Sequence, residues 1–429
     1  MTGTINGIIE GFYGTPWSWE ERSSLASWCG ARGLAHYVYA PKDDPLHRER
    51  WAEPYGADTL AAFAGLVEDG GLEVGFALSP GLSIDYGAAD DRAALAAKVD
   101  QVLDIGVRLI VLALDDIPVR PGLGPQHASL TTWLADHVRD RSDGALVLVP
   151  TEYTGTASTP YLDALAEGVP DDVPIAWTGP TVVCDEVTAD QAAARAAALG
   201  DRRPLLWDNY PVNDTVMADR LFLGPLRGRD AALRGELGGY LANPMVQATA
   251  NRLPLASTAA WWRGVDPYEV WSSEAEALGW RTFAEACDGE VPRRLVAEAI
   301  ADPAGALDPL EAWLHAASTC TAPGLEVEAA AWLDQVHVEA SAGLVAVAAA
   351  RLGLAGDRTD AVIGQVMALS VLWPQARRSA CAVLGPRCSF RPVLSQWSDG
   401  GWRFHAASAQ IDDNALDALA AWAIEVCGV

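Results

Sequence analysis

Eight short apolar runs recur at nearly regular intervals in the first 250 residues, and this rhythm limits the fold more than any other feature of the chain. The runs are rich in Val, Ile, Leu, Tyr and Phe, and successive runs begin 28 to 37 residues apart. Ala-rich amphipathic stretches that are typical of helices, such as 92–106 and 190–200, lie between them. The runs occupy residues 6–14, 36–41, 73–81, 109–116, 146–153, 174–180, 204–209 and 239–244.

This alternation predicts a (β/α)8 TIM barrel over residues 1–262, because eight β-α units at this spacing fill about 250 residues. Continuous apolar runs suit parallel strands that are buried on both faces. A doubly wound open sheet is the alternative fold. Such sheets usually have fewer strands, and no GxGxxG motif follows the first run.

The composition and the hydrophobic pattern of the sequence change after about residue 255. Strand-like runs stop, and stretches rich in Ala, Leu and Glu dominate, such as 325–353 and 412–427. We therefore predict an all-α helical domain over residues 263–429. This domain could pack on the barrel, mediate homodimerisation, or add a wall to a substrate groove, and the sequence does not choose among these roles.

Charge and cysteine usage argue against several kinds of partner. The formal net charge is −27, which repels polyanions, so we expect no nucleic-acid partner and disfavour long acidic polysaccharides. The seven cysteines form no CxxC motif and no zinc-ligand spacing. We expect no metal and no other cofactor.

Two further features bear on location. No apolar run approaches the ~18 residues that are needed to cross a bilayer, so we expect no contact with a membrane. The N-terminal stretch MTGTINGIIEGFYG has neither the basic region nor the cleavage site of a secretory leader. From this stretch we expect a cytoplasmic protein.

Polar and aromatic residues gather where the apolar runs end. The active sites of TIM barrels lie at the C-terminal ends of the strands, so these residues would share one rim. One polar residue after a strand usually caps a helix, but caps do not need Trp, Tyr and Lys beside them. The strand ends carry Glu10 to Tyr13, Lys42 to Asp44, Asp115 and Asp116, Glu152 and Tyr153, Trp177 and Thr178, Trp207 to Asn209, and Asn243.

The chemistry of this rim favours a carbohydrate site. Aromatic side chains suit the apolar face of a sugar ring, and Asp and Asn can bind adjacent hydroxyls. No strand end carries a His, which argues against a metal site or a Ser-His or Cys-His nucleophile. Among the reaction types considered, the hydrolysis of a glycoside with carboxylates as catalytic groups is the one that these residues still favour.

Asp115 and Asp116 are the natural candidates for this chemistry. Two close carboxylates raise the pKa of one of them, which leaves one as a proton-carrying acid and the other as an anion near neutral pH. The alternative interpretation is a helix cap beside a buried, hydrogen-bonded aspartate.

A series of motifs resembles one family of enzymes over residues 5–262. In order along the chain they are EGFYGTPWS, YAPKDDP, SPGLSIDY, LALDDIP, PTEYTGT, WTGP, WDNYPVND and LFLGPLRGR. Together they resemble glycoside hydrolase family 84, which contains the protein O-GlcNAcases and bacterial β-N-acetylglucosaminidases, sometimes called hyaluronidases.

The resemblance implies a retaining β-N-acetylglucosaminidase that acts on terminal β-linked GlcNAc. In this mechanism the 2-acetamido oxygen of the substrate is the nucleophile and an oxazoline is the intermediate. A tethered nucleophile reaches effective molarities of about 10⁵–10⁸ M, so the enzyme need not supply one. The resemblance assigns Asp115 to orienting the acetamide N–H and Asp116 to general acid and base catalysis.

The resemblance also implies a set of substrate-binding residues. Tyr153 would steady the acetamide and the oxazoline, and Trp207 would pack against the N-acetyl group. Lys42 is one of only two lysines, and its compact ammonium could reach a hydroxyl where a guanidinium does not fit. The positions that would hold the sugar and its hydroxyls are Gly11, Lys42, Asn209, Asp214 and Asn243.

The sequence is also compatible with two other functions. A β-glucosidase or related glycosidase of the same fold could act on a particular metabolite, although it would need a different nucleophile. A non-catalytic GlcNAc-binding protein is the third hypothesis, and two retained aspartates argue against it. The natural aglycone could be a protein, a cell-wall fragment or a small conjugate.

Overall fold

The computed structural model describes residues 4–357, 360–376, 378, 380–385, 390–396, 402–408 and 414–428. These residues form two compact units. The barrel unit contains Met1–Thr215, Leu226–Pro267 and Phe390–Ala407, and the helical unit contains Val216–Pro225, Tyr268–Ser389 and Ser408–Val429.

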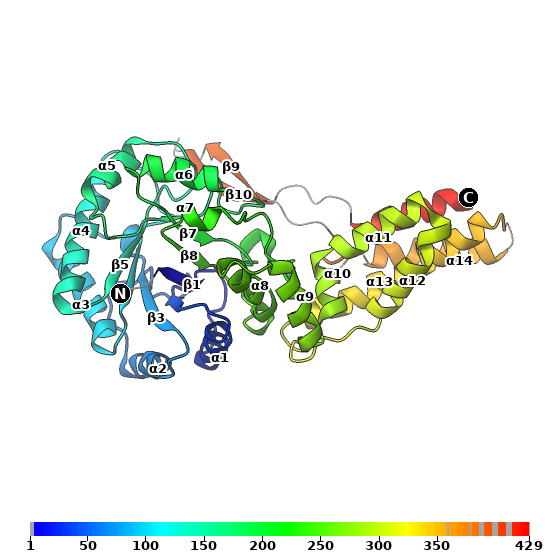
Figure 1. Ribbon diagram of the computed structural model, residues 1–429, viewed down its shortest axis with the longest axis horizontal. Helices are drawn as coiled ribbons and strands as arrows, with labels where there is room; N and C mark the ends of the chain where they lie inside the picture. The colour runs from blue at the N-terminus through cyan, green and yellow to red at the C-terminus, as the bar shows by residue number, and fades with distance from the viewer. Residues whose placement is uncertain are drawn as a thin grey trace. The chain divides into compact units, whose positions relative to one another are not determined.

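The barrel unit is built on an eight-stranded parallel sheet that nearly closes on itself (Figure 1). The sheet order is β5-β4-β3-β2-β1-β8-β7-β6. A bridge between Leu148 and Ile175 joins the two ends, and a second bridge links Thr154 with Gly179 beyond the strand ends. The pairing of β1 with β8 confirms the TIM barrel and excludes an open doubly wound sheet. The strands are β1 Ile5–Glu10, β2 His36–Tyr39, β3 Glu73–Leu78, β4 Leu109–Ala113, β5 Ala145–Val149, β6 Ala176–Trp177, β7 Leu205–Asp208 and β8 Gly239–Ala242.

Helices α1 to α6 lie around the outside of these strands (Figure 1). Local sequence sets their ends: Ser18 and Glu21 form a capping box at the start of α1, and Thr188 and Gln191 do so for α6. The helices of this unit are α1 Trp19–Gly30, α2 Ala57–Glu68, α3 Ala89–Asp104, α4 Leu123–Arg141, α5 Pro160–Gly168, α6 Ala189–Ala198, α7 Leu233–Glu236 and α8 Arg252–Trp262.

Alternate residues of the strands fill the interior of the barrel. Val38, Val111, Val147 and Leu205 belong to one buried apolar cluster, to which Trp207 contributes near the end of β7. Residues of the opposite parity face the helices, which explains why the sequence runs are apolar throughout. The filled interior places the polar side chains at the strand ends.

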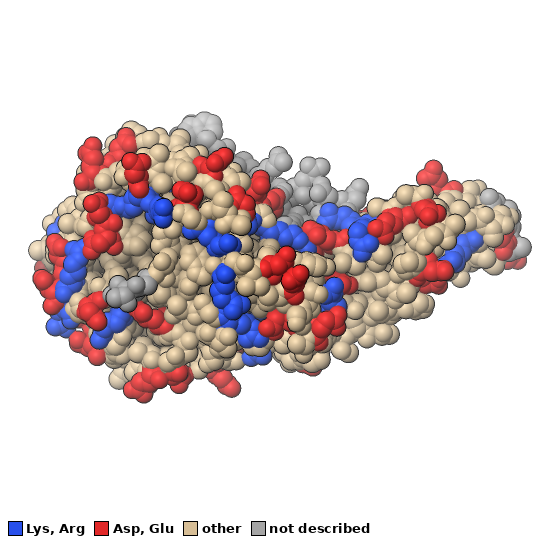
Figure 2. All heavy atoms as spheres, viewed as in Figure 1, with Lys and Arg blue, Asp and Glu red and all other residues tan. Residues whose placement is uncertain are grey.

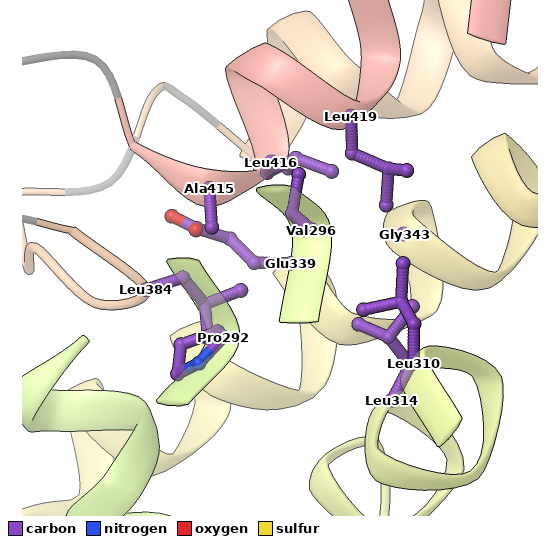
Figure 3. A pocket seen from close by; sticks show the side chains of 10 residues that line it. All are labelled: Pro292, Val296, Leu310, Leu314, Glu339, Gly343, Leu384, Ala415, Leu416 and Leu419. Atoms are coloured by element: carbon purple, nitrogen blue, oxygen red, sulfur yellow. The ribbon is translucent and has the colours of Figure 1, made fainter. Parts of the chain in front are cut away.

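The helical unit contains α9 Pro267–Leu278, α10 Arg281–Asp288, α11 Glu290–Ala301, α12 Pro303–Ala317, α13 Ala330–Leu354, α14 Asp360–Ala376 and α15 Ala415–Cys427. A small pocket among α11, α12, α13 and α15 has aliphatic walls apart from Glu339 (Figure 3). The Glu339 carboxylate accepts hydrogen bonds from Gln335 and from Asn414, the N-cap of α15. This pocket is therefore part of the packing that joins α13 to α15.

Helix α13 is long and apolar enough to cross a bilayer, judged by its length and composition alone. Its most apolar 18-residue window has a mean hydropathy of 1.2, and 56% of that window is buried inside the protein. Core helices of soluble proteins pass the same test, so the expected absence of a membrane contact stays a prediction.

A two-stranded sheet in the C-terminal region was not predicted. It pairs β9 Phe390–Gln396 with β10 Trp402–Ser408. The segment WRFHA alternates apolar and polar residues, which is the pattern of a half-buried strand. The prediction of helices alone after residue 255 overlooked this short alternation.

Acidic and basic side chains are interspersed on the face shown in Figure 2. This arrangement fits a chain whose carboxylates outnumber its cations, with a formal net charge of −27. The expected absence of a nucleic-acid partner stays a prediction.

Candidate active site

The C-terminal ends of the barrel strands bring all nine predicted site residues into one network of contacts. Lys42 contacts Asp115, while Asp116 contacts Tyr153 and, through Tyr13, Asp214. The remaining four, Gly11, Trp207, Asn209 and Asn243, form one wall that lies beside Lys42. The network spans residues more than 200 positions apart in the chain, as the barrel requires.

Asp115 and Lys42 form a buried ion pair. The Lys42 Nζ atom lies 2.5 Å from Oδ2 of Asp115, and the two side chains are only 3% and 8% exposed. Among the described residues, the other oxygen, Oδ1, is buried and has no hydrogen-bond partner. The carboxylate is thus anchored through one oxygen, and among the described residues its second oxygen is a buried acceptor without a donor.

Asp116 has a left-handed backbone conformation, with φ of +52°. Successive residues of a strand point to opposite faces, so a regular strand would send the two carboxylates apart. Strand β4 ends at Ala113, and the left-handed residue Asp116 follows it, with its side chain against two tyrosines at the rim. The Arg48 guanidinium donates to the Asp116 carbonyl at 3.1 Å and holds this turn in place.

Two tyrosine hydroxyls hold the Asp116 carboxylate. Tyr13 donates to Oδ2 and Tyr153 donates to Oδ1, each at 2.8 Å. Burial raises the pKa of both tyrosines, and the nearby Asp116 charge raises it further, so both hydroxyls keep their protons at neutral pH.

The pKa of Asp116 is lowered from its ordinary value. Burial acts to raise it, but the Lys42 ammonium, the hydroxyls of Tyr13 and Tyr153, and Arg48 outweigh that effect. From the sequence, repulsion within the aspartate pair was expected to leave one member as a proton carrier. For Asp116 without substrate, the neighbouring cations and donors favour the anion instead.

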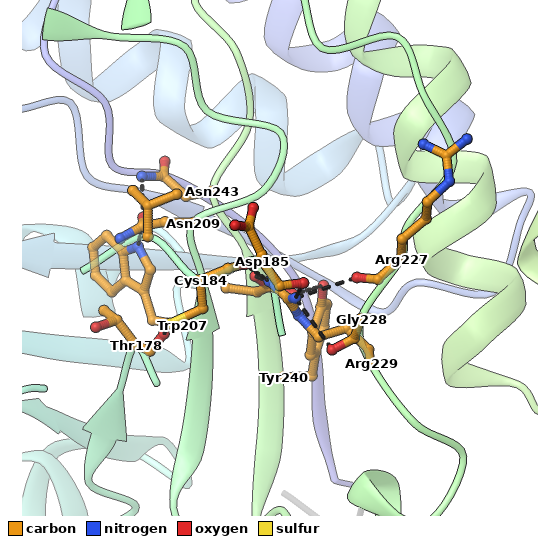
Figure 4. A network of polar contacts seen from close by, with 12 residues as sticks. Thr178, Cys184, Asp185, Trp207, Asn209, Arg227, Gly228, Arg229, Tyr240 and Asn243 are labelled. Carbon is orange, nitrogen blue, oxygen red and sulfur yellow. Dashed lines mark hydrogen bonds and ion pairs between the residues drawn. The ribbon is translucent and has the colours of Figure 1, made fainter. Parts of the chain in front are cut away.

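Trp207, Asn209, Asn243 and Gly11 form the wall beside Lys42, which lies 5.8 Å from the centre of the Trp207 ring. Figure 4 shows Asn209 between Trp207 and Asn243. Its side-chain oxygen accepts hydrogen bonds from the indole N–H at 3.0 Å and from the Asn243 amide at 2.9 Å. The Gly11 N–H donates to Asn243 at 3.1 Å. These bonds fix the plane of the indole.

Gly11 leaves no room for a side chain. A Cβ atom at this position would lie 2.3 Å from Cζ2 and 2.8 Å from Cη2 of Trp207. We expect Gly11→Ala to displace the indole and to lower kcat/KM by about 10–100-fold, since a shift near 1 Å in an active site can cost that much. Steady-state kinetics on an aryl glycoside of GlcNAc would measure the loss.

Gly65→Ala is the matched control, because a Cβ on this α2 glycine meets nothing within 4 Å. It should leave the kinetics unchanged. If Gly11→Ala kept the wild-type kcat/KM, activity would not depend on the fixed position of the Trp207 indole.

Asp214 lies at the edge of the site and is half-buried. Its Oδ2 atom accepts the backbone N–H of Tyr13 at 2.7 Å, which ties the loop after β1 to the loop after β7. Burial raises the pKa of Asp214, and the Asp116 charge acts in the same direction.

Three other strand-end carboxylates hold the framework together. Glu10 binds Arg22 through two hydrogen bonds, and Asp44 accepts hydrogen bonds from the hydroxyls of Tyr39 and Tyr55. Asp208 pairs with Arg229 at 2.7 and 2.9 Å and also accepts from Tyr240. Figure 4 shows Arg229 beside Tyr240. Such paired carboxylates are not available to a ligand.

Sequence reasoning missed two residues of the site. Tyr13 was noted only as part of a polar strand end, and Arg48 was not noted. The position of Tyr13 in EGFYG was the available signal. Arg48 follows β2 by nine positions and reaches Asp116 only through the fold, so no local pattern marks it.

Within the part of the chain that the structure describes, no group of three or more His, Cys, Asp or Glu side chains could hold a metal ion. The donors around Asp115 and Asp116 are an ammonium, a guanidinium and phenol hydroxyls, which bind anions and not cations. This set of groups is suited to acid-base chemistry on an organic substrate.

Comparisons with known proteins give a consistent result. The family model described as beta-N-acetylglucosaminidase matches residues 6–288. The protein O-GlcNAcases of Rattus norvegicus and Mus musculus are each 32% identical over 275 residues, which cover 60% of this chain and 30% of theirs. The match therefore spans less than a third of the length of these relatives.

A solved structure of a mutant O-GlcNAc hydrolase from Thermobaculum terrenum has the same fold. The TM-score is 0.81 at 24% sequence identity, and the similarity covers 98% of this chain and 94% of that one. At this identity the likeness concerns the fold alone. It extends over the helical region as well as the barrel.

Proposed function

The chain belongs to the β-N-acetylglucosaminidase family of glycoside hydrolases, and from this premise we propose that it removes terminal β-linked GlcNAc by substrate-assisted catalysis. The observation that best supports the proposal is the hydrogen bonding of the Asp115 carboxylate. One oxygen of this buried carboxylate is anchored on Lys42, and the other is unpartnered among the described residues. A buried acceptor without a donor is costly, and an acetamide N–H would satisfy it.

In the first step, the acetamide oxygen of the substrate attacks C1 of the sugar and forms the oxazoline. The hydrogen bond from the acetamide N–H to Asp115 orients the group and stabilises the positive charge that develops on it. The bond from C1 to the aglycone oxygen breaks with retention of its electron pair on oxygen. Asp116 delivers the proton that this oxygen requires.

Asp116 must therefore become protonated when substrate binds. The Tyr153 hydroxyl has one proton, which it donates to Asp116 in the free protein. We infer that the acetamide oxygen takes this hydrogen bond on binding. Asp116 then loses a donor that stabilised its anion, its pKa rises, and it can carry a proton.

In the second step, Asp116 is a carboxylate again and acts as the base. It takes a proton from water while the water oxygen attacks C1, which opens the oxazoline and restores the acetamide. Two displacements at the same carbon retain the β configuration. Trp207, Asn209, Asn243, Asp214, Gly11 and Lys42 bind the sugar in this proposal.

Tyr13→Phe tests the acid-base assignment through the pH dependence of kcat/KM. The phenyl ring no longer donates to Asp116, so the pKa of the carboxyl rises and the protonated acid persists to higher pH. The alkaline limb of the profile should move to higher pH. In the control Tyr86→Phe, which removes a hydroxyl bonded to His127 instead, the limb should stay in place. A limb that moved to lower pH in Tyr13→Phe would contradict the assignment.

A panel of aryl β-glycosides of GlcNAc, GalNAc and glucose tests the function itself. Activity confined to the acetamido sugars would support a hexosaminidase. Activity on the glucoside would favour the alternative glycosidase, and tight GlcNAc binding without turnover would favour a sugar-binding protein. We propose that the enzyme acts in the cytoplasm, where the aglycone could be a protein, a cell-wall fragment or a small conjugate.

A further inference from the structure

Arg195 on α6 is a fully buried arginine whose hydrogen bonds go to main-chain carbonyls. Its guanidinium donates to Glu152 at 2.7 Å, to Thr154 at 3.2 Å and to Gly155 at 3.5 Å. Among the described residues it forms no ion pair with a carboxylate. Burial lowers the pKa of Arg195 to about 10, so the group stays charged at neutral pH.

A buried guanidinium without a hydrogen-bonded carboxylate is expensive, because the charge leaves water. Main-chain carbonyls and the longer-range attraction of the Glu152 charge offset only part of this cost, since the pKa of Arg195 is still lowered. The three carbonyls that receive it belong to one segment, 152–155. Tyr153 is the residue of that segment whose side chain enters the site, where its hydroxyl lies 2.8 Å from Asp116.

Other contacts hold the same segment at the end of β6. The Tyr153 carbonyl accepts the Thr178 N–H at 2.9 Å, and Trp177 donates from its indole to Gly155 at 2.8 Å. Arg195 is the only charged side chain among these donors, and it bonds to carbonyls on both sides of Tyr153. The backbone at Tyr153 thus has little freedom to move.

We propose that Arg195 is a positioning residue, which holds the Tyr153 hydroxyl at the acetamide and Asp116 by clamping the carbonyls on either side of Tyr153. The part of this inference that concerns the acetamide rests on the proposed function. Arg195 does not touch the substrate and acts only through Tyr153.

Arg202 provides a matched control elsewhere in the same unit. It also donates to two main-chain carbonyls, Val169 at 2.7 Å and Val173 at 3.2 Å, and burial lowers its pKa. It differs from Arg195 in a long ion pair, at 3.5 Å, with the exposed Asp171. These carbonyls lie between α5 and the start of β6, at the end of the barrel opposite the site. A purely structural role for such clamps would make the two arginines equivalent.

The test is a double-mutant cycle with Arg195→Lys and Tyr153→Phe, and with Arg202→Lys as the control. Lysine keeps the charge but loses the planar fork that reaches several carbonyls. Arg195→Lys should lower kcat about 10–100-fold with a smaller change in KM, as expected for a misplaced group in an active site. In the Tyr153→Phe background the same substitution should cost less than about threefold, because sites that act as a unit are not additive.

Additive losses in the cycle, or an equal loss in Arg202→Lys, would overturn the proposal. If Arg195→Lys does not fold, Arg195→Gln, which keeps an amide donor, replaces it in the cycle. If neither variant folds, Arg195 belongs to the fold alone and the proposal is wrong. A wild-type protein without hexosaminidase activity would instead defeat the proposed function, so the two failures are distinguishable.

Discussion

Asp116→Asn is expected to lower kcat for GlcNAc glycosides with poor leaving groups by about 10²–10⁴-fold, the usual contribution of general acid catalysis. An alkyl or sugar leaving group needs a proton, whereas a dinitrophenolate leaves without one. The loss in the first chemical step should therefore shrink as the aryl leaving group becomes more acidic. Rates over a series of aryl glycosides, followed by single turnover, would measure this dependence.

The substitution should leave the fold intact. The amide oxygen of the variant would still accept a hydrogen bond from one of the two tyrosine hydroxyls that hold the wild-type carboxylate. Thermal unfolding of the variant would check this point. Equal losses on good and poor leaving groups would show that Asp116 is not the acid.

Asp115→Asn should also be severe, with an expected loss in kcat of about 10²–10³-fold by analogy with the removal of one preorganised group from a transition state. The amide has an NH2 group in place of one of the two carboxylate oxygens, so it cannot offer an acceptor both at the Lys42 position and at the acetamide position. Every glycoside of GlcNAc needs the acetamide to attack, so the loss should be the same for good and poor leaving groups. This flat dependence distinguishes Asp115 from Asp116.

Asp115→Asn carries a cost in stability as well. Lys42 would keep its buried charge without a counter-charge, and breaking a buried pair by removing one partner costs about 3–5 kcal/mol at most. Chemical denaturation would measure the change in unfolding free energy, and the kinetics belong at a temperature where the variant is fully folded. A loss that depended on the leaving group would contradict the role assigned to Asp115.

The barrel could be predicted because its repeating unit sets the spacing of apolar runs along the chain. Each of the eight runs overlaps a strand of the barrel, and the polar residues at the run ends lie at the rim. A short two-stranded sheet has no repeat of this kind, and β9 and β10 were overlooked for that reason.

The sequence predicted which residues gather at the site, but not the contacts that they make with one another. No local pattern indicates that Tyr13 and Tyr153, from different strand ends, would meet at the same carboxylate. The direction of the Asp116 pKa follows from those contacts and from Lys42, which cannot be predicted from the aspartate pair alone. Arg195 contacts the site loop from a helix about 40 residues further along the chain, and its role is likewise visible only in the fold.

The most direct test of substrate assistance is the rate on aryl β-glycosides of GlcNAc whose N-acetyl group carries none, one, two or three fluorines. Fluorine withdraws electrons from the acetamide oxygen and weakens it as a nucleophile, while the leaving group stays the same. If the substrate supplies the nucleophile, kcat/KM falls steeply with each fluorine. A flat response would mean that the enzyme supplies the nucleophile, and the role proposed for Asp115 would then be wrong.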